Sequence, residues 1–283
     1  MAAIVIVLLT ILPAACASPT SSPPADPSTA SGPAASSPVA QRPSGEITVF
    51  AAASLADAFN EIGERFKAAN PGAGITFNFG ASTQLVAQLD QGARADVFAS
   101  ADQAQMDRAK SAGRIEGAER LFAANHLVVI TPARNPRGVR GPGNLSKPGL
   151  KLVTSQPDVP IGIYTQAMLD RMSHNAQYGA SFKEQVNANV VSREANVRQI
   201  VAKVQLGEAD AGVVYRSDVT PQLAPQLTSF DIPDEFNTVA TYPIAQVKHA
   251  PNRAGAEAFI AFVLSPDGQE VLARWNFVPA GAR

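Results

Sequence analysis

The chain has little of what metal centres and nucleic-acid surfaces need. Its 283 residues include one cysteine and three histidines, which leaves few side chains for a zinc or iron site. The 23 lysines and arginines are balanced by 24 aspartates and glutamates, for a formal net charge of -1. Nucleic-acid binding usually requires a basic patch. We therefore expect neither a metal held directly by side chains nor a nucleic-acid partner.

A hydrophobic run long enough to span a membrane is missing from the N-terminal region. Residues 4–12 (IVIVLLTIL) are apolar, but crossing a bilayer takes roughly 20 such residues. The run is typical of a secretory signal. Ala14, Ala15 and Cys16 follow it and resemble the cleavage site of a bacterial lipoprotein, in which the cysteine carries the lipid. We expect a signal peptide over 1–16 and lipidation of Cys16, which would anchor the protein to a membrane.

That lipoprotein motif has departures in this chain. Pro13 stands where the motif usually has a leucine-like residue, and Leu12 lies one position too early. A plain secretory signal with an incidental cysteine is the alternative.

Large apolar residues are almost absent from residues 17–45, which are rich in proline, serine, alanine and threonine. Such a segment buries too little surface to offset its ordering entropy. It is typical of a flexible tether. We therefore expect the fold to occupy about residues 46–283.

Strand and helix patterns alternate through that remainder. Apolar residues recur at helical spacing at Leu55, Phe59, Ile62 and Phe66, directly after the strand-like run ITVFAA. The patterns predict strands over 47–52, 75–80, 96–100, 126–131, 150–155, 209–215 and 238–248. They predict helices near 55–69, 82–91, 100–112, 161–173, 178–187, 197–206, 252–264 and 266–275. The alternation indicates an α/β fold with mainly parallel sheets flanked by helices, and the number of elements suits two lobes.

Uncharged groups stand at several predicted strand-to-helix turns. In doubly wound sheets, ligands bind beyond the carboxyl ends of the strands. Helix N-termini there present unpaired N–H groups and a positive partial charge, so several together can bind an anion. The candidates are Ser54, Ser82, Ile161 within VPIGIY, Val197 and Tyr215.

Each candidate also has a purely structural interpretation. The pair Ser54 and Asp57 fits a capping box, and Ser82 is a good N-cap residue. The remaining interpretations are a turn shaped by Pro160 and Gly162, a core position for the Val197 side chain, and a buried Tyr215 with a satisfied hydroxyl.

Seven segments in order carry a resemblance to a known family. They are ITVFAAASLADAF, FNFGASTQLVAQL, GARADVFASADQAQMD, VPIGIY, ANVRQIVAKV, DAGVVYRSD and YPIAQV. Over about residues 46–283 the chain closely resembles the periplasmic molybdate-binding proteins of bacterial molybdate ABC transporters.

The resemblance implies a two-lobe periplasmic-binding-protein fold of type II with two crossover segments. Lobe 1 would comprise 46–125 plus 240–283, and lobe 2 would comprise 126–239. Neutral donors would hold the oxyanion between the lobes, so that the metal is bound only through the oxygens of molybdate. The implied donors are the hydroxyls of Ser54, Ser82 and Tyr215 and the backbone N–H groups of Ile161 and Val197. The position of Ile161 is often alanine in relatives, which affects the shape of the pocket but not the backbone donor.

The implied function is extracytoplasmic capture of molybdate or tungstate by a monomer that delivers it to a membrane ABC permease, without a cofactor. The alternative is a binding protein for another tetrahedral oxyanion, such as sulfate. Enzymes fit less well, because no G-x-S-x-G elbow or G-x-G-x-x-G fingerprint occurs at the expected turns. Porphobilinogen deaminase has a similar two-lobe fold but needs a cofactor-bearing cysteine, and the single cysteine here is Cys16 in the leader.

Overall fold

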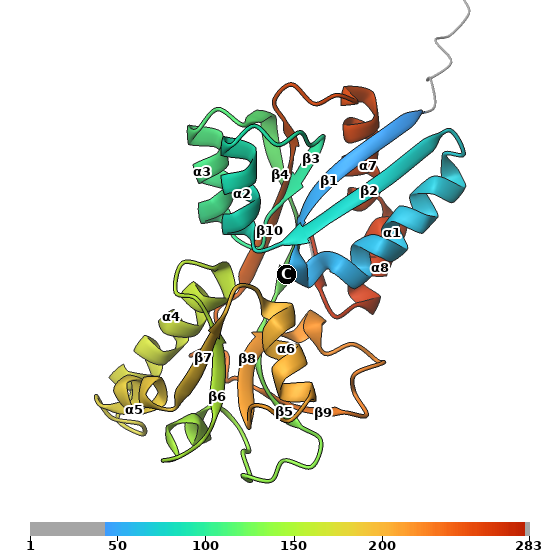
Figure 1. Ribbon diagram of the computed structural model, residues 1–283. Helices are drawn as coiled ribbons and strands as arrows, with labels where there is room; N and C mark the ends of the chain where they lie inside the picture. Colours follow the sequence, from blue (N-terminus) through green and yellow to red (C-terminus); the bar gives the residue numbers. More distant parts are fainter. Residues whose placement is uncertain (1–42, 281–283) are drawn as a thin grey trace, which may run out of the picture. The chain divides into compact units, whose positions relative to one another are not determined.

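The computed structural model describes residues 43–280, which form two β-sheets with helices packed against both (Figure 1). The predicted signal peptide (1–16), Cys16 and most of the predicted tether (17–45) lie outside the described residues. Within 43–280, no helix combines the length and the apolar character needed to cross a bilayer.

The first sheet has six strands in the order β11-β4-β10-β3-β1-β2. β1 pairs in parallel with β2 and β3, whereas β10 runs antiparallel to β3 and β4. The interior strand β1, next to the edge strand β2, carries the continuous apolar run that a strand covered on both faces requires. The strands are β1 (Gly45–Ala52), β2 (Ala73–Gly80), β3 (Val97–Ala99), β4 (Ile115–Asn125), β10 (Ala240–Val247) and β11 (Val278–Pro279).

The second sheet has five strands in the order β7-β6-β8-β5-β9. β6 is parallel to β7 and β8, while β5 is antiparallel to β8 and β9. The strands are β5 (Leu127–Pro132), β6 (Leu152–Ser155), β7 (Val190–Glu194), β8 (Ala211–Tyr215) and β9 (Leu227–Asp231).

Helices cover both faces of each sheet (Figure 1). Helices α1, α7 and α8 lie on one side of the first sheet and α2 and α3 on the other, whereas α4 and α5 lie opposite α6 across the second. We call the first sheet with its helices the first-sheet half, and the second sheet with its helices the second-sheet half. The helices are α1 (Ala56–Ala69), α2 (Ser82–Asp90), α3 (Gln103–Ser111), α4 (Pro160–His174), α5 (Phe182–Ala188), α6 (Val197–Gln205), α7 (Arg253–Leu264) and α8 (Pro266–Arg274), with short 3₁₀ turns η1 (Ala53–Leu55), η2 (Pro142–Ser146) and η3 (Arg216–Asp218).

The predicted α/β class with two sheets is confirmed, but both sheets are mixed rather than mainly parallel. The sequence patterns also missed β4, β7, β9 and β11. β4 (IEGAERLFAAN) has several charged and exposed residues and no regular alternation. Its place in the sheet is fixed by pairing with β10, a contact distant in sequence.

The chain crosses between the halves twice, from β4 to β5 and from β9 back to β10. Asn237, in the second crossing, joins it to the first: its side-chain amide donates to the Leu127 carbonyl and accepts from the Leu127 N–H, both at 3.0 Å. Apart from Gly45, the strands of each sheet fall inside one of the two predicted lobe ranges; the lobe boundaries themselves stay a prediction.

Aromatic packing dominates the core of the first-sheet half. The ring of Phe59 on α1 lies 5.6 Å from that of Phe122 and 5.9 Å from that of Phe259, measured between centroids. This burial of α1 fixes the strand-to-helix turn that precedes it.

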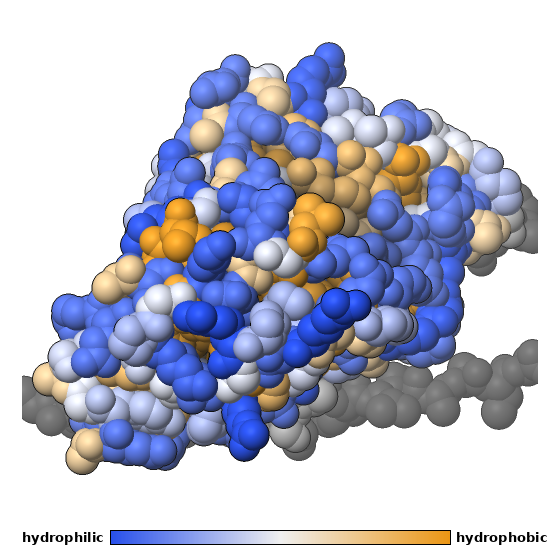
Figure 2. Space-filling view, turned by 60° about the horizontal axis from the view of Figure 1, so that its bottom comes forward, coloured by the Kyte–Doolittle hydropathy of each residue, from blue (hydrophilic) through white to orange (hydrophobic). Residues whose placement is uncertain are grey.

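The face in Figure 2 is mainly hydrophilic, and its hydrophobic residues form small separate groups.

Candidate functional site

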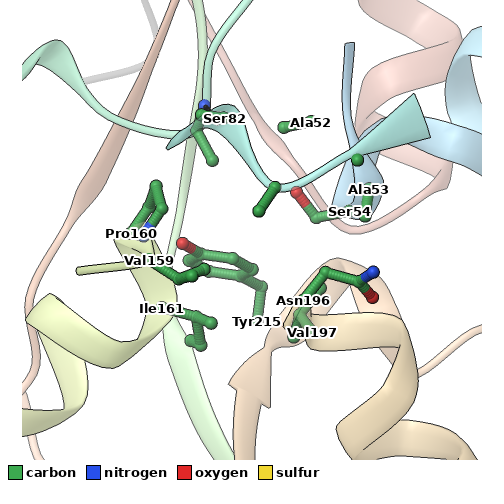
Figure 3. Close-up of a pocket in the computed structure, with 13 residues that line it drawn as sticks. Ala52, Ala53, Ser54, Ser82, Val159, Pro160, Ile161, Asn196, Val197 and Tyr215 are labelled. Atoms are coloured by element: carbon green, nitrogen blue, oxygen red, sulfur yellow. Dashed lines mark hydrogen bonds between the residues drawn. The ribbon is translucent and has the colours of Figure 1, made fainter. Parts of the chain in front are cut away.

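One small cavity lies between the two halves, beyond the carboxyl ends of strands from both sheets. All five predicted donors, Ser54, Ser82, Ile161, Val197 and Tyr215, line it. In Figure 3 the two serines stand on one side of the cavity, and the other three lie across from them. The remaining lining residues are Ala52, Ala53, Gly80, Ala81, Ala101, Val159, Pro160 and Asn196.

The cavity suits a compact group of oxygens. Its volume is about 20 Å³. Pockets for drug-sized organic ligands are far larger, roughly 300–1,000 Å³. The thirteen lining residues include no Lys, Arg, Asp or Glu, so the wall itself is uncharged.

Four helical N-termini supply backbone donors to this wall. η1 begins at Ala53, α2 at Ser82, α4 at Pro160 and α6 at Val197, and each starting residue lines the cavity. The first N–H groups of a helix have no intrahelical acceptor, and a helix N-terminus carries a partial positive charge. The backbone alone therefore makes the cavity favourable for an anion.

Local sequence explains where two of these helices start. The Asn196 side chain caps α6 by accepting from the Gln199 N–H at 3.3 Å. Pro160 is the first residue of α4, where its missing N–H costs nothing. Gly162 follows, and a Cβ built there would lie 2.0 Å from the Gln156 carbonyl oxygen. Only glycine lets the 156–159 loop pack this closely on α4.

The capping interpretation of Ser82 is wrong. Ala81 occupies the N-cap position of α2 and Ser82 is the first helical residue. The Ser82 oxygen instead accepts from the Ala101 N–H at 3.0 Å. Its hydroxyl proton therefore remains available for a ligand.

The capping box of Ser54 and Asp57 is also wrong. The 3₁₀ turn η1 intervenes between β1 and α1, so Leu55 becomes the N-cap of α1 and no side chain caps it. Ser54 lies 3.0 Å, oxygen to oxygen, from the hydroxyl of Tyr242 on β10. Asp57 accepts from Arg198 at 2.6 Å.

Tyr215 does not have the satisfied hydroxyl that a structural aromatic would have. The residue is 2 % exposed, and its hydroxyl oxygen has no hydrogen-bond partner among the described residues. Burial raises the pKa of this hydroxyl well above its usual value, so the group stays a proton donor at neutral pH. A buried donor without an acceptor is uncommon and costly, and this one faces the cavity (Figure 3).

Three charged residues form a cluster directly behind the cavity wall. Asp218 is fully buried, and its carboxylate accepts from the Tyr215 N–H at 3.1 Å. Burial raises the pKa of Asp218 to about 6, and the Arg198 guanidinium opposes part of that rise. Arg198 Nε lies 3.6 Å from Asp218 Oδ1, and Arg198 also bonds Asp57.

The sequence interpretation missed Tyr242, Arg198 and Asp218 as parts of this region. All three lie inside the segments quoted for the resemblance, YPIAQV, ANVRQIVAKV and DAGVVYRSD. Arg198 directly follows the predicted donor Val197, which was the available signal for it; Tyr242 and Asp218 stand next to no predicted donor in the sequence.

The cavity wall offers hydrogen-bond donors, the hydroxyls of two serines and one tyrosine together with backbone N–H groups. The three histidines, His126, His174 and His249, are not among the residues that line the cavity. Within 43–280, no group of three or more His, Cys, Asp or Glu side chains is placed to hold a metal ion.

Known proteins with similar sequences include molybdate-binding proteins. The chain is 41% identical over 231 residues to the molybdate-binding protein ModA of Mycobacterium tuberculosis H37Rv, covering 82% of this chain and 84% of that protein. It is 32% identical over 240 residues to ModA of Escherichia coli K12, covering 82% and 89%. These matches confirm the predicted resemblance to molybdate-binding proteins.

A solved structure supports the fold. The substrate-binding domain assigned to a molybdenum ABC transporter of Clostridium difficile superposes with a TM-score of 0.62 at 28% identity, covering 83% of this chain and 99% of that one. The family model of bacterial extracellular solute-binding proteins matches residues 47–278. That match includes all eight α-helices and every described strand, apart from the first two residues of β1 and the last residue of β11. The chain therefore belongs to the bacterial extracellular solute-binding protein family.

Proposed function

We propose that the protein captures molybdate, and equally tungstate, in the cavity between its two halves and delivers it to a membrane ABC permease. The relatives at 41% and 32% identity are named as molybdate-binding proteins, which supports this ligand. In the proposal, lobe 1 (46–125 plus 240–283) and lobe 2 (126–239) close around the oxyanion.

One observation carries the proposal: the buried Tyr215 hydroxyl faces a cavity bordered by four helical N-termini and has no acceptor among the described residues. A bound oxyanion would supply that acceptor. Ser82 would donate its free proton, and Ile161 and Val197 would donate through their backbone N–H groups. Ser54 would donate if Tyr242 donates to Ser54, an arrangement that the 3.0 Å contact allows.

The energetics require many donors acting together. Moving an isolated ion into a protein interior costs on the order of tens of kcal/mol, whereas a hydrogen bond to a charged group returns about 1.5–3 kcal/mol net. A helix N-terminus adds about 0.3–1 kcal/mol, and up to ~2 kcal/mol when partly buried. Convergence of five residues and several helix ends is therefore what a buried dianion needs in a wall without Lys or Arg.

Selectivity follows from the same chemistry. A wall of donors offers no good acceptor for the proton of hydrogen phosphate, which would be left unpaired. Sulfate carries no proton at neutral pH, so only cavity size can reject it. Tungstate has nearly the size and charge of molybdate and should bind with similar affinity.

Calorimetric titration of the purified protein with molybdate, tungstate, sulfate and phosphate tests the proposal. We expect tight binding of the first two and at least tenfold weaker binding of the others. Equal binding of sulfate and molybdate would replace the proposal with a general oxyanion binder. If none of the four anions binds, the proposed function is refuted. A thermal melt with ligand at ~100 times Kd should show about 2.7 kcal/mol of added stability.

The cellular setting is part of the proposal. Cys16 would carry the lipid that holds the protein on the outer face of the cytoplasmic membrane, and the protein would act as a monomer. Mass spectrometry of the mature protein should show the added acyl chains, and Cys16→Ala should release the protein from membranes. Light scattering on a sizing column should give the monomer mass with and without ligand.

A further inference from the structure

Arg198 makes a charged contact between the two halves. It is the second residue of α6 in the second-sheet half, and its side chain reaches the turn that follows β1 in the first-sheet half. Its Nε donates to the Ala53 carbonyl at 3.1 Å, and its Nη2 donates to Asp57 Oδ2 at 2.6 Å. One planar guanidinium therefore holds both the backbone of η1 and the first turn of α1.

These contacts sit at the cavity wall itself. Ala53 lines the cavity, and Arg198 follows Val197, a proposed backbone donor. Arg198 also lies 3.6 Å from Asp218, which accepts from the Tyr215 N–H. The guanidinium thus connects the turn that carries Ser54 with the segments that carry Val197 and Tyr215.

Four neutral hydrogen bonds also join the halves. Thr83 Oγ1 donates to the Asp158 carbonyl at 3.1 Å, and the Tyr164 hydroxyl donates to the Ala101 carbonyl at 3.5 Å. The side-chain amides of Asn125 and Asn276 donate to Ser217 Oγ at 2.8 Å and to the Val219 carbonyl at 3.4 Å. Each is a single contact between neutral groups, whereas Arg198 makes two from a charged guanidinium, one of them to a carboxylate. Hydrogen bonds to ionised groups are shorter and stronger than neutral ones.

We propose that Arg198 and Asp57 form a latch that stabilises the closed arrangement of the two halves and so sets the residence time of the ligand. The effect of the latch on ligand binding rests on the proposed function, that is, on molybdate being the ligand. Arg198 is a positioning residue here: it acts by holding η1 against α6 and need not touch the anion.

A purely electrostatic role makes a different prediction. If Arg198 only offset the negative charge of Asp57 and Asp218 near an anion, neutralising Asp57 would tighten binding. If the latch holds the halves together, neutralising Asp57 weakens binding, because the bridge is lost. Arg198→Lys keeps the charge but cannot reproduce the forked pair of contacts.

The test combines four variants with a matched control. Arg198→Met, Arg198→Lys, Asp57→Asn and the double variant Arg198→Met/Asp57→Asn are titrated with molybdate, and dissociation is followed by stopped flow. Arg253→Met and Glu116→Gln break an ion pair of 2.8 Å that lies within the first-sheet half and serve as controls. Far-ultraviolet circular dichroism verifies that each variant folds.

We expect Arg198→Met and Asp57→Asn each to weaken molybdate binding at least tenfold, mainly through faster dissociation. Arg198→Lys should fall between wild type and Arg198→Met, and the double variant should lose no more than the worse single variant. The controls should stay within twofold of wild type. Tighter binding by Asp57→Asn, full affinity in Arg198→Lys, or additive losses in the double variant would overturn the latch.

A ligand-free measurement separates this proposal from the proposed function. Spin labels at Ala112→Cys and Ala176→Cys, in a Cys16→Ser background, report the distance between the halves. Arg198→Met should shift that distance distribution to longer values without any oxyanion present. An unchanged distribution would refute the latch even if wild type binds molybdate; failure of wild type to bind would refute the function and leave this distance result to decide the latch.

Discussion

Tyr215→Phe removes one hydroxyl and keeps the ring, so it asks what that buried donor is for. The ring packs edge-on against Tyr164 and Tyr242, with centroids 6.4 Å and 5.9 Å away, and phenylalanine preserves both contacts. The hydroxyl has no partner among the described residues. Its removal therefore takes no hydrogen bond from the ligand-free protein.

Removing the hydroxyl should affect ligand-free stability and ligand affinity in opposite directions. A buried polar group left unpaired costs about 1–3 kcal/mol, so the ligand-free variant should be as stable as wild type or more stable by up to that amount. The lost hydrogen bond to a charged ligand is worth about 1.5–3 kcal/mol, which corresponds to a roughly 10- to 150-fold rise in Kd.

The assay pairs urea unfolding without ligand and calorimetric titration with molybdate. Tyr178→Phe is the matched control, because Tyr178 packs against Phe182 and Phe236 and does not line the cavity; it should leave affinity unchanged. If Tyr215→Phe lowers the free energy of unfolding while Kd stays at the wild-type value, the hydroxyl is structural and the reasoning is refuted.

Three further predictions concern other parts of the site. Ser54→Ala should weaken molybdate binding more than it lowers ligand-free stability: no side-chain cap is lost, and loss of the 3.0 Å contact with Tyr242 should cost about 1 kcal/mol; such a loss of stability with unchanged Kd would contradict this. Gly162→Ala should weaken binding and lower the melting temperature, because its Cβ would clash with the Gln156 carbonyl; titration and a thermal melt with wild-type values would contradict it. Asp218 has a folded-state pKa of about 6 against an ordinary value of 3.8, so the folded protein binds this proton more strongly than the unfolded chain does. Protonated Asp218 therefore stabilises the folded state by about 3 kcal/mol, and this contribution is lost as pH rises through about 6. Urea unfolding from pH 4 to 7 should show the stability of Asp218→Asn rising relative to wild type by about that amount, and a constant gap would count against the buried carboxylate.

Local sequence order explains why the proposed donors could be predicted. Ser54 and Ser82 each stand where a strand pattern gives way to a helix pattern, and Val197 opens a predicted helix; in α/β folds strand-to-helix turns gather at one edge of a sheet. The prediction of their shared location needed only the order of elements and the resemblance. Their hydrogen-bond partners did not follow, because those depend on the exact start of each helix.

The Ser54 turn illustrates that limit. A capping box assumes that α1 begins directly after the serine, but η1 places the N-cap one residue later, at Leu55. The actual partner of Ser54 is Tyr242, 188 residues away. Arg198 and Asp57 are 141 residues apart. Pairings over such separations are set by how the two sheets assemble, which periodicity along the chain does not encode.

Asn237 gives the two crossings a common mechanical property. Because its amide bonds both backbone groups of Leu127, the outgoing and returning segments are tied to each other where they pass between the halves. Pulling the two segments apart at this point would have to break both bonds, so the segments should bend together when the halves move.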